Sequence, residues 1–280
     1  MTMLERLLPV AKIAKYTFID DVRQRGFLVM FAILVAIVLL SRGCYQGSYM
    51  VDGRLVDTGM VVGSISQAAF HMIVFGTMLI TALLSMRLLK RDRDEGMQVL
   101  ILSKPITRSQ YMLGKVLGIW FLSSLFMASL HFIVFLIASV TLGAVKPGYL
   151  VASLLASSNL LFVVIAVLLL TLLMPDILAV LMVLGVGVIG LVGDGLYALG
   201  QSQTAQAILQ QSGARPPSGL TFWRVIYSVW PKLSGTARFA ATFVDGSFSS
   251  RLVYPFINIL LYCLILGFLL LLKFRRQEIL

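Results

Sequence analysis

Long apolar stretches alternate with short polar segments along the whole chain of 280 residues. A helix needs roughly 20 mostly apolar residues to cross the ~30 Å hydrocarbon core of a bilayer. Six stretches reach or approach this length, and we predict a membrane-spanning helix in each: 26–41, 66–86, 116–142, 149–174, 177–199 and 252–272. The pattern predicts an all-α fold, with residues 1–280 forming a single polytopic membrane domain of six transmembrane helices.

The composition agrees with this class. Hydrophobic residues make up 59% of the chain and charged residues only 12%, against about 25% charged residues in soluble domains. The formal net charge of +11 could suggest nucleic acid as a partner. However, if the N-terminus is cytoplasmic, the inner segments 1–25, 87–115 and 273–280 hold 5, 7 and 3 Lys/Arg, which is 15 of 23. This positive-inside bias predicts an inner-membrane protein with both termini cytoplasmic, whose basic surface faces lipid headgroups and not nucleic acid.

The first 25 residues have a pattern of their own. Basic and acidic residues lie off a stripe of apolar residues at helical spacing, which consists of Leu4, Leu7, Leu8, Ala11, Ala14 and Phe18. We predict a basic amphipathic helix that lies in the inner headgroup layer. The alternative is an ordinary cytosolic segment that leads into the first span.

A long polar segment, 200–251, precedes the last span. Aromatic residues with a polar edge, which favour the headgroup level, recur in it at helical spacing: Trp223, Tyr227 and Trp230. We predict one or two short interfacial or re-entrant helices on the outer side. A further full span is the alternative, and the charges of Arg224, Lys232 and Arg238 disfavour it.

Motifs for nucleotide chemistry are absent or out of context. The sequence has no G-x-x-x-x-G-K-[ST] motif, and "GVGVIG" (185–190) lies inside an apolar span with no strand before it. "GMVVG" (59–63) and "GKVLG" (114–118) match the G-x-x-x-G pattern of close helix packing. Because no paired cysteines, HExxH or clustered carboxylates accompany the two histidines, His71 and His131, we predict that the chain is not itself an enzyme and binds no metal or cofactor.

Polar residues inside the predicted spans are candidates for a transport path, since they are costly in a membrane. The candidates are His71, His131, Asn159 and Asn258. The alternative is that these side chains only form hydrogen bonds between helices.

The densest charge cluster of the chain lies between the second and third spans, in the region 87–115. We expect its acidic residues Asp92, Asp94 and Glu95 to open a short helix, since acids favour a helix N-terminus. This helix would carry an apolar stripe made by Met97, Leu100 and Ile101. A short amphipathic helix below the membrane suits docking into a groove of a soluble partner. The alternative is a solvated loop that happens to be charged.

The end of the region predicts where the third span starts. Pro105 stops the short helix, and "TRSQ" forms a capping box with Thr107 as N-cap and Gln110 at N3. The third helix should therefore begin at about Arg108, with Lys115 at the water boundary.

The run "RDRDEGMQVLILSKPITRSQYMLGKVLG" (91–118) resembles the signature of ABC-2 type transporter permeases. These are the membrane subunits of type V ABC exporters, and they include the nitrous-oxide-reductase maturation permease group. Gln98 departs from the pattern, because many relatives have Thr or Ser there. The resemblance implies a coupling helix between the second and third spans; with the stripe above, its candidate ATPase-coupling residues are Asp94, Glu95, Gly96, Met97, Leu100, Ile101, Ser103 and Pro105.

The resemblance also implies the partners of the chain. These are two copies of a separate ABC ATPase subunit that binds ATP and Mg, a second permease chain in a homo- or heterodimer, the lipid bilayer, and, as a further candidate, a periplasmic or accessory protein. The implied function is ATP-driven export. Two alternatives stay open: an ion-coupled secondary carrier with His71 and His131 as relays, and a membrane anchor or mechanical transducer that transports nothing.

Overall fold

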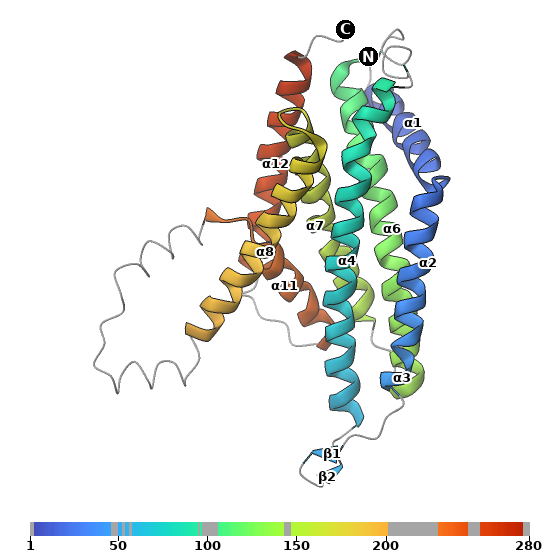
Figure 1. The fold of residues 1–280 in the computed structure, drawn as a ribbon, viewed down its shortest axis with the longest axis vertical. Helices are drawn as coiled ribbons and strands as arrows, with labels where there is room; N and C mark the ends of the chain where they lie inside the picture. The colour runs from blue at the N-terminus through green and yellow to red at the C-terminus, as the bar shows by residue number, and fades with distance from the viewer. Residues whose placement is uncertain are drawn as a thin grey trace, which may run out of the picture.

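The computed structural model describes residues 3–45, 50–51, 54–55, 58–94, 96, 106–142, 147–200, 229–245 and 253–276. These residues form a bundle of long helices (Figure 1), so the all-α prediction is confirmed for them apart from one small hairpin. The hairpin joins β1 (Met50–Val51) to β2 (Arg54–Leu55). The helices are α1 (Met3–Val22), α2 (Arg25–Leu40), α3 (Arg42–Tyr45), α4 (Thr58–Asp94), α6 (Arg108–Leu142), α7 (Gly148–Thr171), α8 (Asp176–Gly200), α11 (Leu233–Asp245) and α12 (Val253–Arg276).

Five helices of the described chain are long and apolar enough to cross a membrane: α4, α6, α7, α8 and α12. They correspond to the second to sixth predicted spans. The first predicted span is α2, which has only 16 residues, so it is shorter than a bilayer requires. It passes as a span only together with α1, from which it is bent by 70°. The structure therefore supports five or six spans.

The helices α4 and α6 are longer than the sequence predicted. They have 37 and 35 residues, and α4 continues through the start of the charge cluster to Asp94. The prediction that Asp92 and Asp94 open a new helix is therefore wrong: both lie at the C-terminal end of α4. Asp92 is tolerated at the C-terminal end of α4 because Lys115 on α6 pairs with its carboxylate. Gly96 follows with a φ of +66°, a left-handed conformation in which glycine commonly ends helices.

Helices α4, α6 and α7 form the centre of the bundle. Figure 1 shows α1 and α2 on one side of it and α8, α11 and α12 on the other. Accordingly α1 and α2 contact α6, and α8, α11 and α12 contact α7. The helix α7 is the most enclosed of the five long apolar helices, since 67% of its most apolar window is buried.

A short helix, α11, lies before the last span, within the part of 200–251 that the structure describes, and its interfacial or re-entrant placement on the outer side stays a prediction. This helix is not on the surface: it packs against α7, α12, α4 and α8. One face is made of small buried residues, Ala237, Ala240 and Ala241, while Arg238 is exposed. Trp223 and Tyr227 lie outside the described residues.

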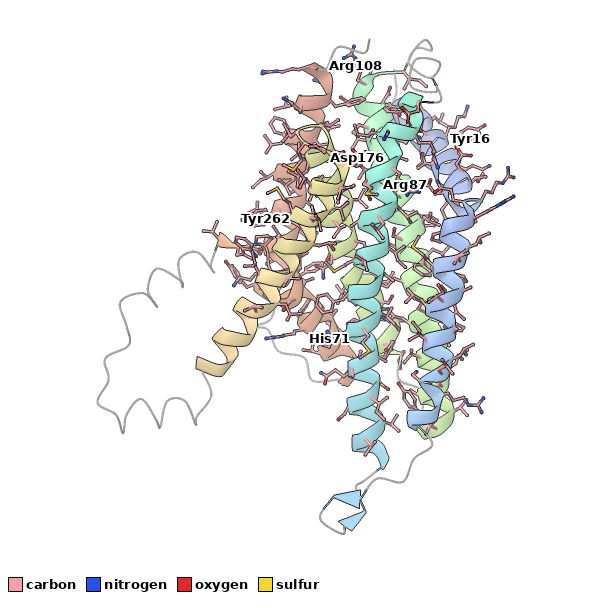
Figure 2. The ribbon with its side chains drawn as sticks, viewed as in Figure 1. Tyr16, His71, Arg87, Arg108, Asp176 and Tyr262 are labelled. Atoms are coloured by element: carbon pink, nitrogen blue, oxygen red, sulfur yellow. The ribbon has the colours of Figure 1, made fainter. Side chains whose placement is uncertain are left out.

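One end of the bundle collects the segments that the sequence places on one side of the membrane. In Figure 1 both chain termini lie at the top, together with the C-terminal end of α4, the first turns of α6 and the C-terminal end of α12. Figure 2 places Arg108 at this end and His71 nearer the opposite end. The described parts of the region 87–115, which are 87–94, 96 and 106–115, therefore lie at the end that carries the start of α1 and the C-terminal end of α12.

Candidate functional site

The start of α6 is fixed by the predicted capping box. The backbone N–H of Thr107 donates to Gln110 Oε1 at 2.9 Å, and the N–H of Gln110 donates to Thr107 Oγ1 at 3.3 Å. The two reciprocal bonds satisfy donors that a helix N-terminus leaves without partners. The helix begins at Arg108, so both the box and the start of the third span are confirmed.

A buried ion pair joins the end of α4 to α6. Lys115 Nζ lies 2.6 Å from Asp92 Oδ2, and only 6% and 5% of the two side chains are exposed. The hydroxyl of Tyr111 donates a hydrogen bond to the same carboxylate oxygen. Lys115, which the sequence predicted at the water boundary, points into the protein toward Asp92, and its depth in the membrane stays a prediction. Removing both charges from water is costly, and close pairing with an additional hydrogen bond offsets that cost.

A second ion pair joins α4 to α1. Arg91 Nη1 lies 3.0 Å from Asp21 Oδ1, and Gln24 Nε2 donates to the same oxygen at 2.8 Å. The other carboxylate oxygen of Asp21 is buried and has no hydrogen-bond partner among the described residues. Burial raises the pKa of Asp21 from its usual 3.8 to about 6, although Arg91 acts in the opposite direction. The carboxylate is therefore incompletely compensated.

Close packing holds α1 on α6. A Cβ on Gly118 would come within 2.8 Å of Ala14 O and of Thr17 Cβ, and one on Gly114 would be equally close to Ile13. The "GKVLG" motif (114–118) is thus a real packing site, and its partner is α1. The glycine that ends the other motif, Gly63, has no atom within 4 Å of such a Cβ.

The C-terminal end of α12 also contacts the start of α6. Arg275 Nε donates to Ser109 Oγ at 2.9 Å, and Arg108 Nη1 donates to the carbonyl of Arg275 at 3.2 Å. The ring of Phe274 stacks on that of Tyr111 with the centroids 5.9 Å apart. The first turns of α6 are therefore the place where α1, α4 and α12 meet.

Between these fixed ends lies the segment that carries the predicted coupling residues. Asp94 is exposed at the end of α4, and Gly96 is exposed just beyond it. The remaining candidates, Glu95, Met97, Leu100, Ile101, Ser103 and Pro105, lie outside the described residues. The structure thus describes the two anchors of this segment, and the coupling helix itself stays a prediction.

The sequence profile of the ABC-2 family transporter proteins matches residues 11–189. The match covers more than half of the chain and runs from α1 to α8, so it includes both ion pairs. The chain belongs to the ABC-2 transporter family. None of the curated proteins matches its sequence. With several apolar helices of spanning length, the chain is a multi-pass membrane permease, and permeases of this family generally work with an ABC ATPase subunit.

The two histidines of this ABC-2 permease that were predicted for a transport path both contact the ring of Phe70. His131 is fully buried, and its Nδ1 lies 2.9 Å from Ser153 Oγ. Its ring stacks on Phe70 with the centroids 4.7 Å apart. His71 is half-buried, and its ring meets Phe70 edge to face at 5.7 Å. The hydrogen bond of Nδ1 and ring packing between helices hold His131 in place, whereas its buried Nε2 has no hydrogen-bond partner among the described residues.

The two predicted asparagines meet the start of α11. Asn159 Nδ2 donates to the carbonyl of Leu233 at 2.9 Å, and the N–H of Lys232 donates to Asn258 Oδ1 at 3.2 Å. They therefore tie α11 to α7 and α12. The structure places the asparagines around α11 and the histidines around Phe70, so it does not bring the four residues into one site.

Buried polar residues that the sequence analysis missed also lie in this part of the permease. The hydroxyl of Ser234 in α11 donates to Asp194 Oδ2 in α8, and both residues are buried. Lys232 interacts electrostatically with Asp194. A signal existed in the sequence, since Asp194 is the only charged residue of the predicted span 177–199, and an ionisable residue in a span is a functional candidate. Within the described chain, His, Cys, Asp and Glu nowhere form a group of three that could hold a metal.

Proposed function

We propose that this ABC-2 permease is the membrane subunit of an ATP-driven exporter of the type V class, similar to the nitrous-oxide-reductase maturation permeases. Separate ATPase subunits, two copies per complex, bind ATP and Mg, and their closure moves the segment 94–105. Substrate then passes along a path between this chain and a second permease chain. The observation that carries the proposal is the anchoring of this segment on both sides, by Asp92–Lys115 before it and by the Thr107–Gln110 capping box after it.

The docking surface for the ATPase would be the segment 94–105 itself. Asp94 and Gly96 are exposed at its start, and Met97, Leu100 and Ile101 supply the apolar stripe that a groove on a soluble partner would take up. Fixed helix ends on both sides favour this role over a solvated loop. A displacement of the segment would be passed to α4 and α6 and not lost in a flexible connection.

The proposed orientation places the end with both termini in the cytoplasm and the permease in the inner membrane. Two observations support it: the Lys/Arg bias toward the segments at that end and the faces of α1. Val10, Ile13 and Thr17 of α1 are buried, whereas Leu8 and Ala11 of the predicted apolar stripe remain exposed next to the basic Lys12 and Lys15. A helix with one face on protein, one apolar face free and basic residues beside it suits the inner headgroup layer.

The test is purification of the tagged chain from its native membrane in mild detergent, with the bound proteins identified by mass spectrometry. The wild type is compared with a variant in which residues 94–103 are replaced by a Gly/Ser linker. In the control variant, residues 201–210 are replaced by a Gly/Ser linker of the same length. This control shows whether replacing any polar segment between spans is enough to lose the bound proteins. We expect a P-loop ATPase to copurify with the wild type and the control and to be lost from the 94–103 variant.

Three results would contradict the proposal. If no ATPase copurifies with the wild type, gradient-driven transport by the chain alone in proteoliposomes becomes the next test, since it defines a secondary carrier. If an ATPase persists on the 94–103 variant, the segment is a solvated loop and docking occurs elsewhere. An ATPase complex that moves no substrate would identify the anchor or transducer.

A further inference from the structure

Two neighbouring residues at the end of α4 point to two different helices. Arg91 pairs with Asp21 of α1, and Asp92 pairs with Lys115 of α6. Tyr111, one turn before Lys115, adds a hydrogen bond to Asp92, and its ring lies 5.7 Å from Lys115 Nζ. One turn of α4 thus connects three helices through charged side chains, immediately before the segment that we propose to dock the ATPase.

We infer that Asp21, Arg91, Asp92, Tyr111 and Lys115 form a clamp that makes α1 and the adjoining ends of α4 and α6 one rigid unit. They are positioning residues: they act through the helices that they join, and they determine which helices follow the coupling segment (94–105). The role in transport rests on the proposed function. The rigid unit itself does not, because it depends only on contacts within this chain.

The energetics of buried ion pairs support a positional role. Two charges taken out of water gain little net stability over apolar side chains of the same size, whereas breaking the pair leaves one charge buried without compensation. The contact between α4 and α6 therefore resists partial separation. Displacement of the segment that follows Asp94 would therefore move the ends of α4 and α6 together. A displacement can be transmitted between sites only through an element that has few alternative arrangements, and the joined helix ends are such an element.

The packing of α1 extends the unit. Gly114 and Gly118 allow the backbone of α1 to approach α6 closely, and the pair Asp21–Arg91 fixes the end of α1 that leads into α2. Helix α1 is therefore attached in two ways: close packing at the two glycines holds it on α6, and the Asp21–Arg91 ion pair joins it to α4. The helix α1 would therefore follow the coupling segment instead of staying in the headgroup layer while α4 moves.

The first arm of the test uses this chain alone in nanodiscs. In a Cys44→Ser, Cys263→Ala background, spin labels are attached through Ala11→Cys on α1 and Lys90→Cys on α4, both exposed positions. The distribution of the distance between the labels is measured by pulsed electron paramagnetic resonance. We expect one narrow distribution in the parent protein, and a broadened one in Lys115→Met, in Asp21→Asn and, to a smaller extent, in Tyr111→Phe.

Matched controls separate the clamp from a general effect of charge. Asp20→Asn neutralises the exposed neighbour of Asp21, and Arg87→Gln neutralises an exposed residue of α4, so both should leave the distribution narrow. Tyr111→Phe removes only a hydroxyl, so it keeps the test valid if Lys115→Met does not fold. Distributions as narrow in Lys115→Met, Asp21→Asn and Tyr111→Phe as in the controls would overturn the clamp.

The second arm uses the complex with the copurified ATPase. If the clamp transmits movement, Lys115→Met should still bind the ATPase. Its permease-dependent stimulation of ATP hydrolysis should be about ten-fold smaller than that of the wild type, which is a typical size for coupling between two sites. Full stimulation in Lys115→Met would overturn the positioning role. Absence of any ATPase on the wild type would refute the proposed function, and the distance measurements would still decide whether the rigid unit exists.

Discussion

Gly114 of α6 lies directly against Ile13 of α1: a Cβ added at Gly114 would come within 2.7 Å of Ile13 Cβ. Real Cβ atoms essentially never approach this closely, so any larger residue at position 114 would push α1 away. The contact shows that α1 is held by the shape of α6 as well as by charge.

We therefore predict that Gly114→Ala destabilises the permease. In a helix, alanine is normally more favourable than glycine by up to about 1 kcal/mol, but here the clash should reverse the sign and cost about 1–3 kcal/mol. Cys263 is buried, so in a Cys44→Ser background its reaction with a thiol dye during heating reports unfolding. Gly114→Ala should react at a lower temperature than the parent.

The control for this prediction is Gly63→Ala on α4, where the added Cβ meets no atom within 4 Å. It should unfold at the same temperature as the parent or slightly higher. If Gly114→Ala behaves as Gly63→Ala does, α1 is free to shift on α6 and the packing argument is wrong.

The comparison of these two glycine motifs shows what the sequence could predict. Both "GMVVG" and "GKVLG" match the same pattern, and no local feature says which of them meets another helix. The capping box was predictable because Thr107 and Gln110 are three residues apart and bond to each other's backbone. A contact between residues close in the sequence can be predicted from their spacing, whereas the helix that packs against a given face cannot.

The extent of α4 was missed for the same reason. Acidic residues at the C-terminal end of a helix oppose its dipole, so Asp92 and Asp94 suggested a new helix. The ion pair with Lys115 offsets this effect for Asp92, but it depends on the tertiary packing of α4 on α6. Likewise the sequence predicted a short helix within 200–251 but not its burial, which comes from contacts of α11 with four other helices.

A pH-dependent effect is expected at Asp21. Its pKa in the folded protein is about 6 against a usual 3.8, so the protonated form favours folding. This contribution is fully present below pH 3.8 and is lost as the pH rises through about 6. The loss amounts to at most about 3 kcal/mol. Because Asn stays neutral, the stability of Asp21→Asn relative to the wild type should increase across this pH range.

The measurement is the unfolding temperature of both proteins at a series of pH values across that interval. Asp20 also raises the pKa of Asp21, but as the smallest of the causes, so Asp20→Asn, which changes the exposed neighbour, should show a much smaller pH-dependent difference from the wild type. A constant difference between Asp21→Asn and the wild type would mean that Arg91 fully compensates the carboxylate, and the assignment of a raised pKa to Asp21 would be rejected.

His131 tests whether a predicted transport-path residue has a structural role. Its ring stacks on Phe70 and bonds Ser153, so His131→Phe retains the ring and the stacking and should cost less than about 1.5 kcal/mol. His131→Ala empties the space and should cost about 3–5 kcal/mol, as loss of a large buried ring does. Chemical unfolding in mixed micelles gives both values. Comparable large losses in both variants would show that the bond to Ser153, and not the packing, holds this part of the bundle.

A large stability effect should also come from the pair Asp92–Lys115. Lys115→Met leaves the buried carboxylate of Asp92 without its counter-ion, and Asp92→Leu leaves the ammonium of Lys115; each should destabilise the fold by about 3–5 kcal/mol. The double variant removes both charges and keeps similar volumes, so it should recover most of the loss, because apolar replacement of a whole buried pair is often neutral.

A double-mutant cycle in mixed micelles measures this coupling directly, with Lys90→Gln, an exposed charge of α4, as a control that should change little. Since the double variant is expected to be stable but to lack the pair, it is also the protein in which stability and coupling can be separated. If the two single losses simply add in the double variant, each residue acts alone, and the pair does not fix the ends of α4 and α6 to each other.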